Sequence, residues 1–118
     1  MKLRIQGNSL RLRLTQKEVA QVRNRGLVES HIEFAPGHSL SYLLEGSPLV
    51  QAPSATFDGR AIRVTIPMHE VTDWVESDSI GIETQSYTGV QLLVEKDFQC
   101  LHRSAEQEPD AYPHPLMT

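Results

Sequence analysis

Basic and apolar residues alternate in the first fourteen positions of the chain, and the basic ones are Lys2, Arg4, Arg11 and Arg13. Because side chains alternate between the two faces of a strand, two strands in phase place all four on one side of a hairpin. An arginine guanidinium is a planar fork of donors that fits phosphates and guanine edges, so this face is a candidate DNA contact. The alternative is a solvated face whose charges pair with acidic residues such as Glu29 and Glu33.

Charge is unevenly distributed along the chain, although the net charge is only −4. Residues 1–52 hold seven Lys and Arg against four Asp and Glu, giving +3, whereas residues 53–118 hold four against eleven, giving −7. Asymmetry of this kind bears on binding partners. The negative total weakens the long-range attraction to phosphates on which non-specific DNA binding depends.

The histidines and the cysteine offer little for metal binding or catalysis; they are His31, His38, His69, His102, His114 and Cys100. None has a zinc-type spacing, and Cys100 with His102 comes closest. Two pairs, His31 with Glu33 and His69 with Glu70, could do acid–base chemistry, but neighbours of this kind arise by chance. No nucleophile elbow, phosphate loop or dinucleotide fingerprint occurs. We therefore predict no catalytic residue, no metal, no cofactor and no enzymatic activity.

The elements that must position these residues repeat along the chain. Residues 1–45, shifted by 52 positions, fall on residues 53–97 without a gap. Apolar positions and glycine turns match, as in Leu12 on Val64, although few pairs are identical. A repeat of this length indicates a duplicated supersecondary unit.

Alternating apolar residues and turn formers predict the order β-β-α-β-β in each half. The predicted strands are 2–5, 10–14, 28–34, 40–44, 55–57, 61–66, 80–84 and 90–95, and the helices are 16–25 and 67–74. Thr15 and Glu18 form a capping-box pattern, Gly26 ends the first helix, and Pro67 is expected at the first helical position of the second. Each unit is too small to bury its own face. The expected fold is therefore α+β but mostly β, with two pseudo-symmetric units closing into one small barrel-like domain.

The predicted domain spans residues 1–98, with repeat 1 at 1–45, a linker at 46–53 and repeat 2 at 54–98. Residues 99–118 form a polar, proline-containing tail. Phe98, just before this tail, and Leu101 and Tyr112 within it either bind a partner or pin the tail across the domain. Apolar runs are too short for a membrane helix, the N-terminus lacks a signal-peptide pattern, and the lone cysteine makes no internal disulfide. We predict a cytoplasmic protein.

The run from Gly7 to Leu14, followed by a capped helix and Gly26, resembles the swapped-hairpin proteins of the AbrB and MazE types. The run from Gly59 to Pro67 resembles the same signature, and a chain with two such units is similar in layout to the MraZ proteins. The resemblance implies that Arg4, Asn8 and Arg13 face DNA. It also implies, for an antitoxin, that an acidic C-terminal extension occupies a toxin.

The whole chain is also similar to a small family of bacterial proteins without assigned function, on Lys2–Arg13 and on the run Val94–Leu101. The leading hypothesis is accordingly a non-enzymatic cytoplasmic binding or regulatory module, either a monomer with pseudo-twofold symmetry or a homodimer. Its partner would be a protein or DNA, and no membrane is expected. One alternative is a DNA-binding regulator or antitoxin that uses the basic first hairpin. Another is a ligand-binding or catalytic barrel lined by His31 or His38.

Overall fold

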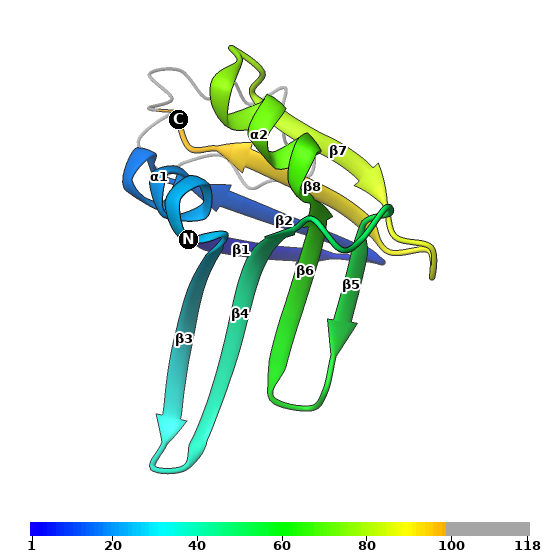
Figure 1. Cartoon of the computed structure of the whole chain (residues 1–118). Helices are drawn as coiled ribbons and strands as arrows, with labels where there is room; N and C mark the ends of the chain where they lie inside the picture. Colours follow the sequence, from blue (N-terminus) through cyan, green and yellow to red (C-terminus); the bar gives the residue numbers. More distant parts are fainter. Residues whose placement is uncertain (99–118) are drawn as a thin grey trace, which may run out of the picture.

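The structure, a computed structural model, describes residues 1–98 and consists of two four-stranded sheets and two helices (Figure 1). Sheet A contains, in spatial order, β1 (Lys2–Gln6), β2 (Ser9–Leu14), β8 (Gln91–Lys96) and β7 (Gly81–Gln85). Sheet B contains β3 (Leu27–Ala35), β4 (His38–Ser47), β6 (Ala61–Pro67) and β5 (Ser54–Phe57). The helices are α1 (Gln16–Arg25) and α2 (Met68–Glu76), which touch each other and strands of both sheets. The described part is therefore mostly β, as predicted.

Local sequence signals set the ends of the helices. The Thr15 hydroxyl accepts a hydrogen bond from the backbone N–H of Glu18, and the Glu18 carboxylate accepts one from the N–H of Thr15. Gly26 ends α1 in the left-handed region at φ 76°, which glycine adopts without steric cost. Pro67 was predicted at the first helical position but lies one position earlier. It is the last residue of β6 and the N-cap residue of α2. The φ of proline suits either place.

Each sheet joins the first hairpin of one half of the chain to the second hairpin of the other half. The central pairs are parallel, with Leu12 of β2 beside Val94 of β8 and Val64 of β6 beside Leu44 of β4. The outer pairs are antiparallel hairpins. Both halves therefore contribute to both sheets, and neither sheet can form from one half alone.

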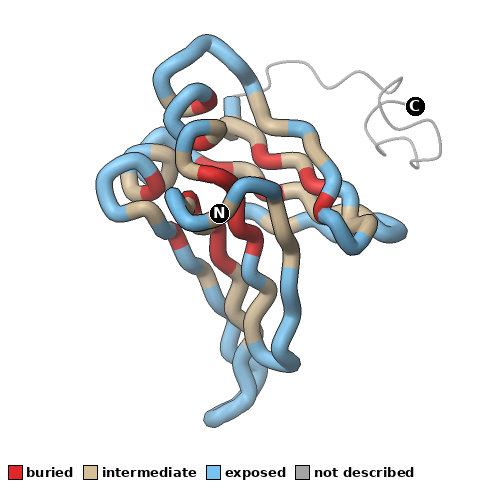
Figure 2. Tube along the Cα trace, turned by 45° about the vertical axis from the view of Figure 1, so that its right-hand side comes forward, coloured by how far each residue is buried: buried red, intermediate tan, exposed pale blue. Residues whose placement is uncertain are grey.

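The buried residues gather where the two sheets and the helices meet (Figure 2). The core that they form is aliphatic apart from one tryptophan. It contains Leu12, Leu14, Val22, Val28, Leu44, Val64, Ile66, Val71, Trp74, Leu92 and Val94. Trp74 is buried, and its indole N–H donates to the carbonyl of Ile80 at 3.2 Å. Burial of these side chains is the main stabilising contribution to the fold.

The predicted closure into a barrel is wrong. Sheet A runs across one end of sheet B, and the far half of sheet B is left uncovered (Figure 1). Within residues 1–98 the outer strands β1, β7, β3 and β5 each pair with a single neighbour, so neither sheet is joined to the other at an edge. The sheets pack face to face, and this packing leaves their edges open. Neither helix in these residues is long and apolar enough to cross a bilayer.

The offset of 52 residues holds inside the second hairpins, where Glu29 pairs with Leu43 and Gly81 with Glu95, but not in the parallel pairing between hairpins. Leu10 pairs with Leu92, whereas its counterpart Ile62 pairs with Tyr42. Leu10 and Ile62 are 52 residues apart, but their partners Leu92 and Tyr42 are 50 apart, so the parallel registers of the two sheets differ by two residues. β4 also continues through Ser47, so the first two residues of the predicted linker belong to a strand.

Candidate binding surfaces

The four basic residues of the first hairpin lie on the outer face of sheet A. Lys2 is opposite Arg13, and Arg4 is opposite Arg11. The apolar residues between them, such as Leu12, face the core. The alternation in the sequence therefore predicted the shared face correctly.

Acidic residues of β8 and of the segment after it neutralise much of this face. Glu95 Oε1 lies 3.1 Å from Nε of Arg11 and 3.6 Å from Nε of Arg13, ion-pair distances without hydrogen-bond geometry. Lys2 Nζ lies 3.1 Å from Oδ2 of Asp97. The parallel pairing of β2 with β8 sets Arg13 directly beside Glu95. The basic first half and the acidic second half thus meet within one sheet.

The acidic partners are not the ones that the sequence suggested. Glu29 and Glu33 lie on β3, in sheet B, whereas the basic residues lie in sheet A. The opposite net charges of the two halves were the signal that could have indicated Glu95, because they predict attraction between halves. Without the pairing of β2 to β8, the particular residue could not be named.

Asn8 holds two turns together. Its side-chain amide donates to the carbonyl of Gly89 at 2.9 Å, and its own carbonyl accepts from the N–H of Gln91 at 3.0 Å. Arg4 borders a hollow of about 230 Å³ on the outer face of sheet A, together with Arg11 and Glu83. The outer face of sheet A is therefore mixed in charge, with Asn8 in a structural contact at its end.

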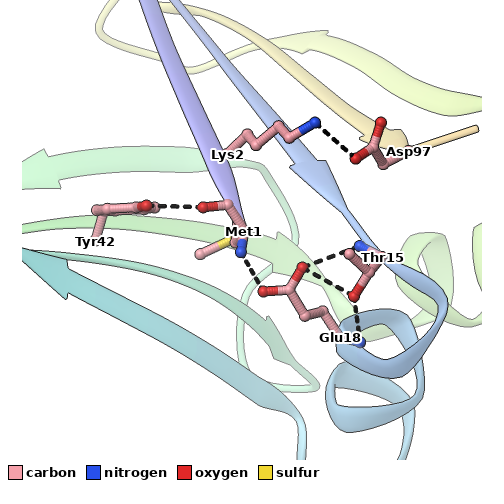
Figure 3. A network of polar contacts seen from close by, with 6 residues as sticks. All are labelled: Met1, Lys2, Thr15, Glu18, Tyr42 and Asp97. Carbon is pink, nitrogen blue, oxygen red and sulfur yellow. Dashed lines mark hydrogen bonds and ion pairs between the residues drawn. The ribbon is translucent and has the colours of Figure 1, made fainter. Parts of the chain in front are cut away.

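A polar cluster fixes the start of β1 against α1 and sheet B (Figure 3). The ammonium group of Met1 forms an ion pair with the Glu18 carboxylate, and the Tyr42 hydroxyl donates to the carbonyl of Met1 at 2.7 Å. Burial raises the pKa of Glu18, but hydrogen bonds from the ammonium and from Thr15 outweigh it and hold the pKa below its ordinary value. β1 is thereby anchored on the inner face of sheet B.

An apolar groove opens between the two sheets at the other end of β1. Its volume is about 430 Å³, within the range of ligand sites. It is lined by Ile5, Gly7, Asn8, Ser9, Leu10, Leu40, Ala55, Thr56, Phe57, Ile62 and Val90. Ile5 is 60% exposed and Phe57 is 62% exposed, although both face an apolar surface. Nothing in the sequence pattern distinguished these residues from core positions.

The groove continues onto the uncovered half of sheet B. Phe57 is paired with Ile62 and Ala55 with Val64, so these residues lie on the same face as the core. On the same face, the hairpin of β3 and β4 carries Ile32, which is 49% exposed. This hairpin projects beyond the rest of the molecule (Figures 1 and 2). The inner face of sheet B is therefore longer than the sheet that covers it.

The remaining candidate residues do not gather into a site. His31 and His38 are exposed on β3 and β4, and neither lines the groove. Across residues 1–98 no three His, Cys, Asp or Glu side chains are placed to hold a metal ion. Phe98 is exposed. The other predicted residues lie outside the described part of the chain; they are Cys100, Leu101, His102, Tyr112 and His114.

The fold and these surfaces define a small, mostly-β protein with an open apolar groove and a sheet face of mixed charge. The model of a family of unknown function, DUF7009, matches residues 1–116, and the chain belongs to that family. No curated protein and no solved structure matches the chain. The expected membership of a family without assigned function is thereby confirmed, while the likeness to swapped-hairpin regulators stays a prediction.

Proposed function

We propose that this protein is a non-enzymatic binding module that holds an extended segment of a partner protein in the apolar groove between its two sheets. The observation that carries the proposal is the combination of an apolar surface with open strand edges. Ile5 and Phe57 expose apolar side chains on β1 and β5, the outer strands that border the groove. Exposed apolar surface of this kind is typical of interaction sites.

Open edges favour a peptide strand over a small molecule as the occupant. In the described residues β1 pairs only with β2, and β5 pairs only with β6. An added strand would bond to the backbone of an outer strand and place alternate side chains in the groove. A strand beside β1 would also extend sheet A over the uncovered half of sheet B. Leu40 and Ile62 would then be covered by apolar side chains of the partner.

The composition of the groove supports binding without catalysis. Its lining contains hydroxyl and amide side chains at Asn8, Ser9 and Thr56, but no acid, base or thiol. A general acid or base would need a titratable group within hydrogen-bond reach of the reacting atoms. The groove offers apolar surface and a few hydrogen-bond partners.

We also infer that the protein works in the cytoplasm, which agrees with its single cysteine. We further infer that its scaffold arose as two β-β-α-β-β units related by a pseudo-twofold axis. In support, the order β1-β2-β8-β7 of sheet A becomes the order of sheet B when each strand is replaced by its counterpart in the other half. Buried residues match at the 52-residue offset in the first hairpin and helix, as in Leu14 with Ile66 and Val22 with Trp74. The units differ in the register at which the second hairpin pairs with the first hairpin of the other half.

The test is selection of a displayed library of random 12-residue peptides on the full chain. We expect enriched peptides to alternate apolar and polar residues, and to slow hydrogen exchange of the β1 amides when bound. Phe57→Asp should abolish their binding. Leu49→Asp is the matched control, because Leu49 is 90% exposed and lies outside the groove.

Three outcomes would overturn the proposal. The first is a library without enriched peptides, and the second is binding that survives Phe57→Asp. The third is tight binding of a small apolar dye in the groove together with no peptide, which would assign the groove to small molecules. Circular dichroism of the variants establishes that each one folds.

A further inference from the structure

We propose that the open edge of β3 pairs antiparallel with β3 of a second copy of this chain, with Ser30 of the two copies at the twofold axis. The proposal uses a different surface from the groove, so either one can fail without the other. It begins from the length of β3. This strand has nine residues and pairs with β4 along one edge. No strand of the described residues covers its other edge. Long exposed edges of this kind are templates for pairing with another chain.

The backbone groups available on this edge follow from the hydrogen bonds to β4. The N–H of Gly46 donates to the carbonyl of Gly26, and hydrogen-bonded pairs alternate along an antiparallel ladder. The even-numbered residues of β3 therefore bond to β4. The odd-numbered ones, Leu27, Glu29, His31 and Glu33, direct their N–H and carbonyl groups to the open edge.

The charges on β3 discriminate between registers. With the axis at Ser30, His31 of each copy lies opposite Glu29 of the other. With the axis at His31, Glu29 of each copy would lie opposite Glu33 of the other, which places like charges together twice. Directly opposed like charges are destabilising in a sheet, whereas the Ser30 register sets each Glu29 opposite an imidazole. Registers with an even-numbered residue at the twofold axis are therefore preferred.

The limits of the regular ladder select Ser30 from the even-numbered positions, because an axis at Val28 would pair only residues 27 to 29 of β3. The pairing of β3 with β4 shifts between Glu33 and Ala35, so the regular ladder ends there. An axis at Ser30 uses residues 27 to 33, all of which lie before this shift, whereas an axis at Ile32 would run through it. Bulges of this kind end or redirect strand pairing.

The Ser30 register also covers apolar surface. Ile32, 49% exposed in one copy, would lie beside Val28 of the other copy on the inner face of sheet B. An axis perpendicular to the sheet keeps the inner faces of both copies on the same side. The dimer would contain one eight-stranded sheet, with the uncovered apolar halves of both copies on one face.

Sedimentation equilibrium of the full chain over a concentration series tests the proposal. Wild type should dimerise reversibly. His31→Lys should strengthen the dimer, because it places a positive charge opposite Glu29 in two symmetric pairs. In this His31→Lys background, Glu29→Lys should weaken the dimer roughly tenfold, because both pairs change from attraction to repulsion. Glu29→Lys combined with His31→Glu should dimerise about as strongly as His31→Lys, because the two charges are only exchanged.

Glu33→Lys in the same His31→Lys background is the matched control, since it makes the same change of charge on the same strand. In the Ser30 register Glu33 lies opposite Leu27 of the other copy, so its substitution should leave the dimer nearly unchanged. A monomer at all concentrations would overturn the proposal. So would a dimer weakened by Glu33→Lys but not by Glu29→Lys, because that pattern belongs to the Ile32 register, or one that responds equally to both.

Discussion

Replacing Glu95 by glutamine should destabilise the fold, because Glu95 joins the basic first half of the chain to the acidic second half. Its Oε1 atom is 3.1 Å from Nε of Arg11 and 3.6 Å from Nε of Arg13, and its side chain is only 19% exposed. Glutamine keeps the shape of the side chain and removes its charge. The two arginines would then lie beside each other on β2 without a counter-charge between them.

The size of the effect lies between two limits. Exposed ion pairs contribute about 0.2–1 kcal/mol each, and removal of one partner of a buried pair costs about 3–5 kcal/mol. Glu95 is mostly buried while Arg11 and Arg13 are partly exposed, so we expect a loss of about 2 kcal/mol for Glu95→Gln. For a domain of this size the midpoint of thermal unfolding should fall by roughly 10 °C.

Urea and thermal unfolding measure this loss, and Glu76→Gln is the control. The Arg23 to Glu76 pair spans 3.4 Å, but both side chains are more than half exposed. Its removal should cost less than about 0.5 kcal/mol. If Glu95→Gln costs no more than Glu76→Gln, the pairing of β2 and β8 does not depend on charge, and our account of this face is wrong. Retention on heparin should rise for Glu95→Gln, since the outer face of sheet A gains positive charge.

Three further substitutions test the packing of Trp74 in the core, the contact of Gly81 with β8, and the contribution of Glu18 to the pH dependence of stability. Trp74→Phe removes buried volume and the hydrogen bond to the Ile80 carbonyl, so chemical denaturation should show a loss of about 2–3 kcal/mol. Gly81→Ala would place a Cβ 2.7 Å from the carbonyl oxygen of Val94, and β7 must shift, so thermal unfolding should show a loss of about 1–3 kcal/mol. The folded pKa of Glu18 is depressed, so its stabilisation is complete above the ordinary value of 4.5 and is lost as the pH falls through the folded value. In acid titrations of the unfolding free energy, Glu18→Gln should lack this part of the pH dependence.

Local features of the fold were predictable because their causes are local. The hydroxyl of Thr15 and the carboxylate of Glu18 are three residues apart, which is the geometry of a capping box. Gly26 supplies the positive φ that ends α1. The alternation through Leu12 and Leu14 places both side chains in the core, whatever the rest of the fold does. The strands and helices followed from signals of this kind.

The relation between the hairpins could not be predicted in the same way. Glu95 as the partner of Arg13 depends on the parallel pairing of two strands about eighty residues apart. The two-residue difference in parallel register at Tyr42 and Leu92 depends on contacts between hairpins, and the 52-residue offset kept inside each hairpin gave no sign of it. Closure into a barrel was expected because each half is too small to bury its own face. The sheets instead face each other, and an alternating pattern is compatible with either arrangement.

The absence of closure changes where a partner would bind. The basic hairpin drew attention because arginines suit phosphates, but two of its arginines and its lysine are paired within sheet A by Glu95 and Asp97. Charges already balanced inside the fold contribute less to a partner than the same charges when free, since their pairing must be broken or shared. Apolar side chains such as Ile5 and Phe57 have no such competition, because their exposure to water is itself unfavourable. The surface with most to gain from a partner is therefore the apolar one at the open strand edges.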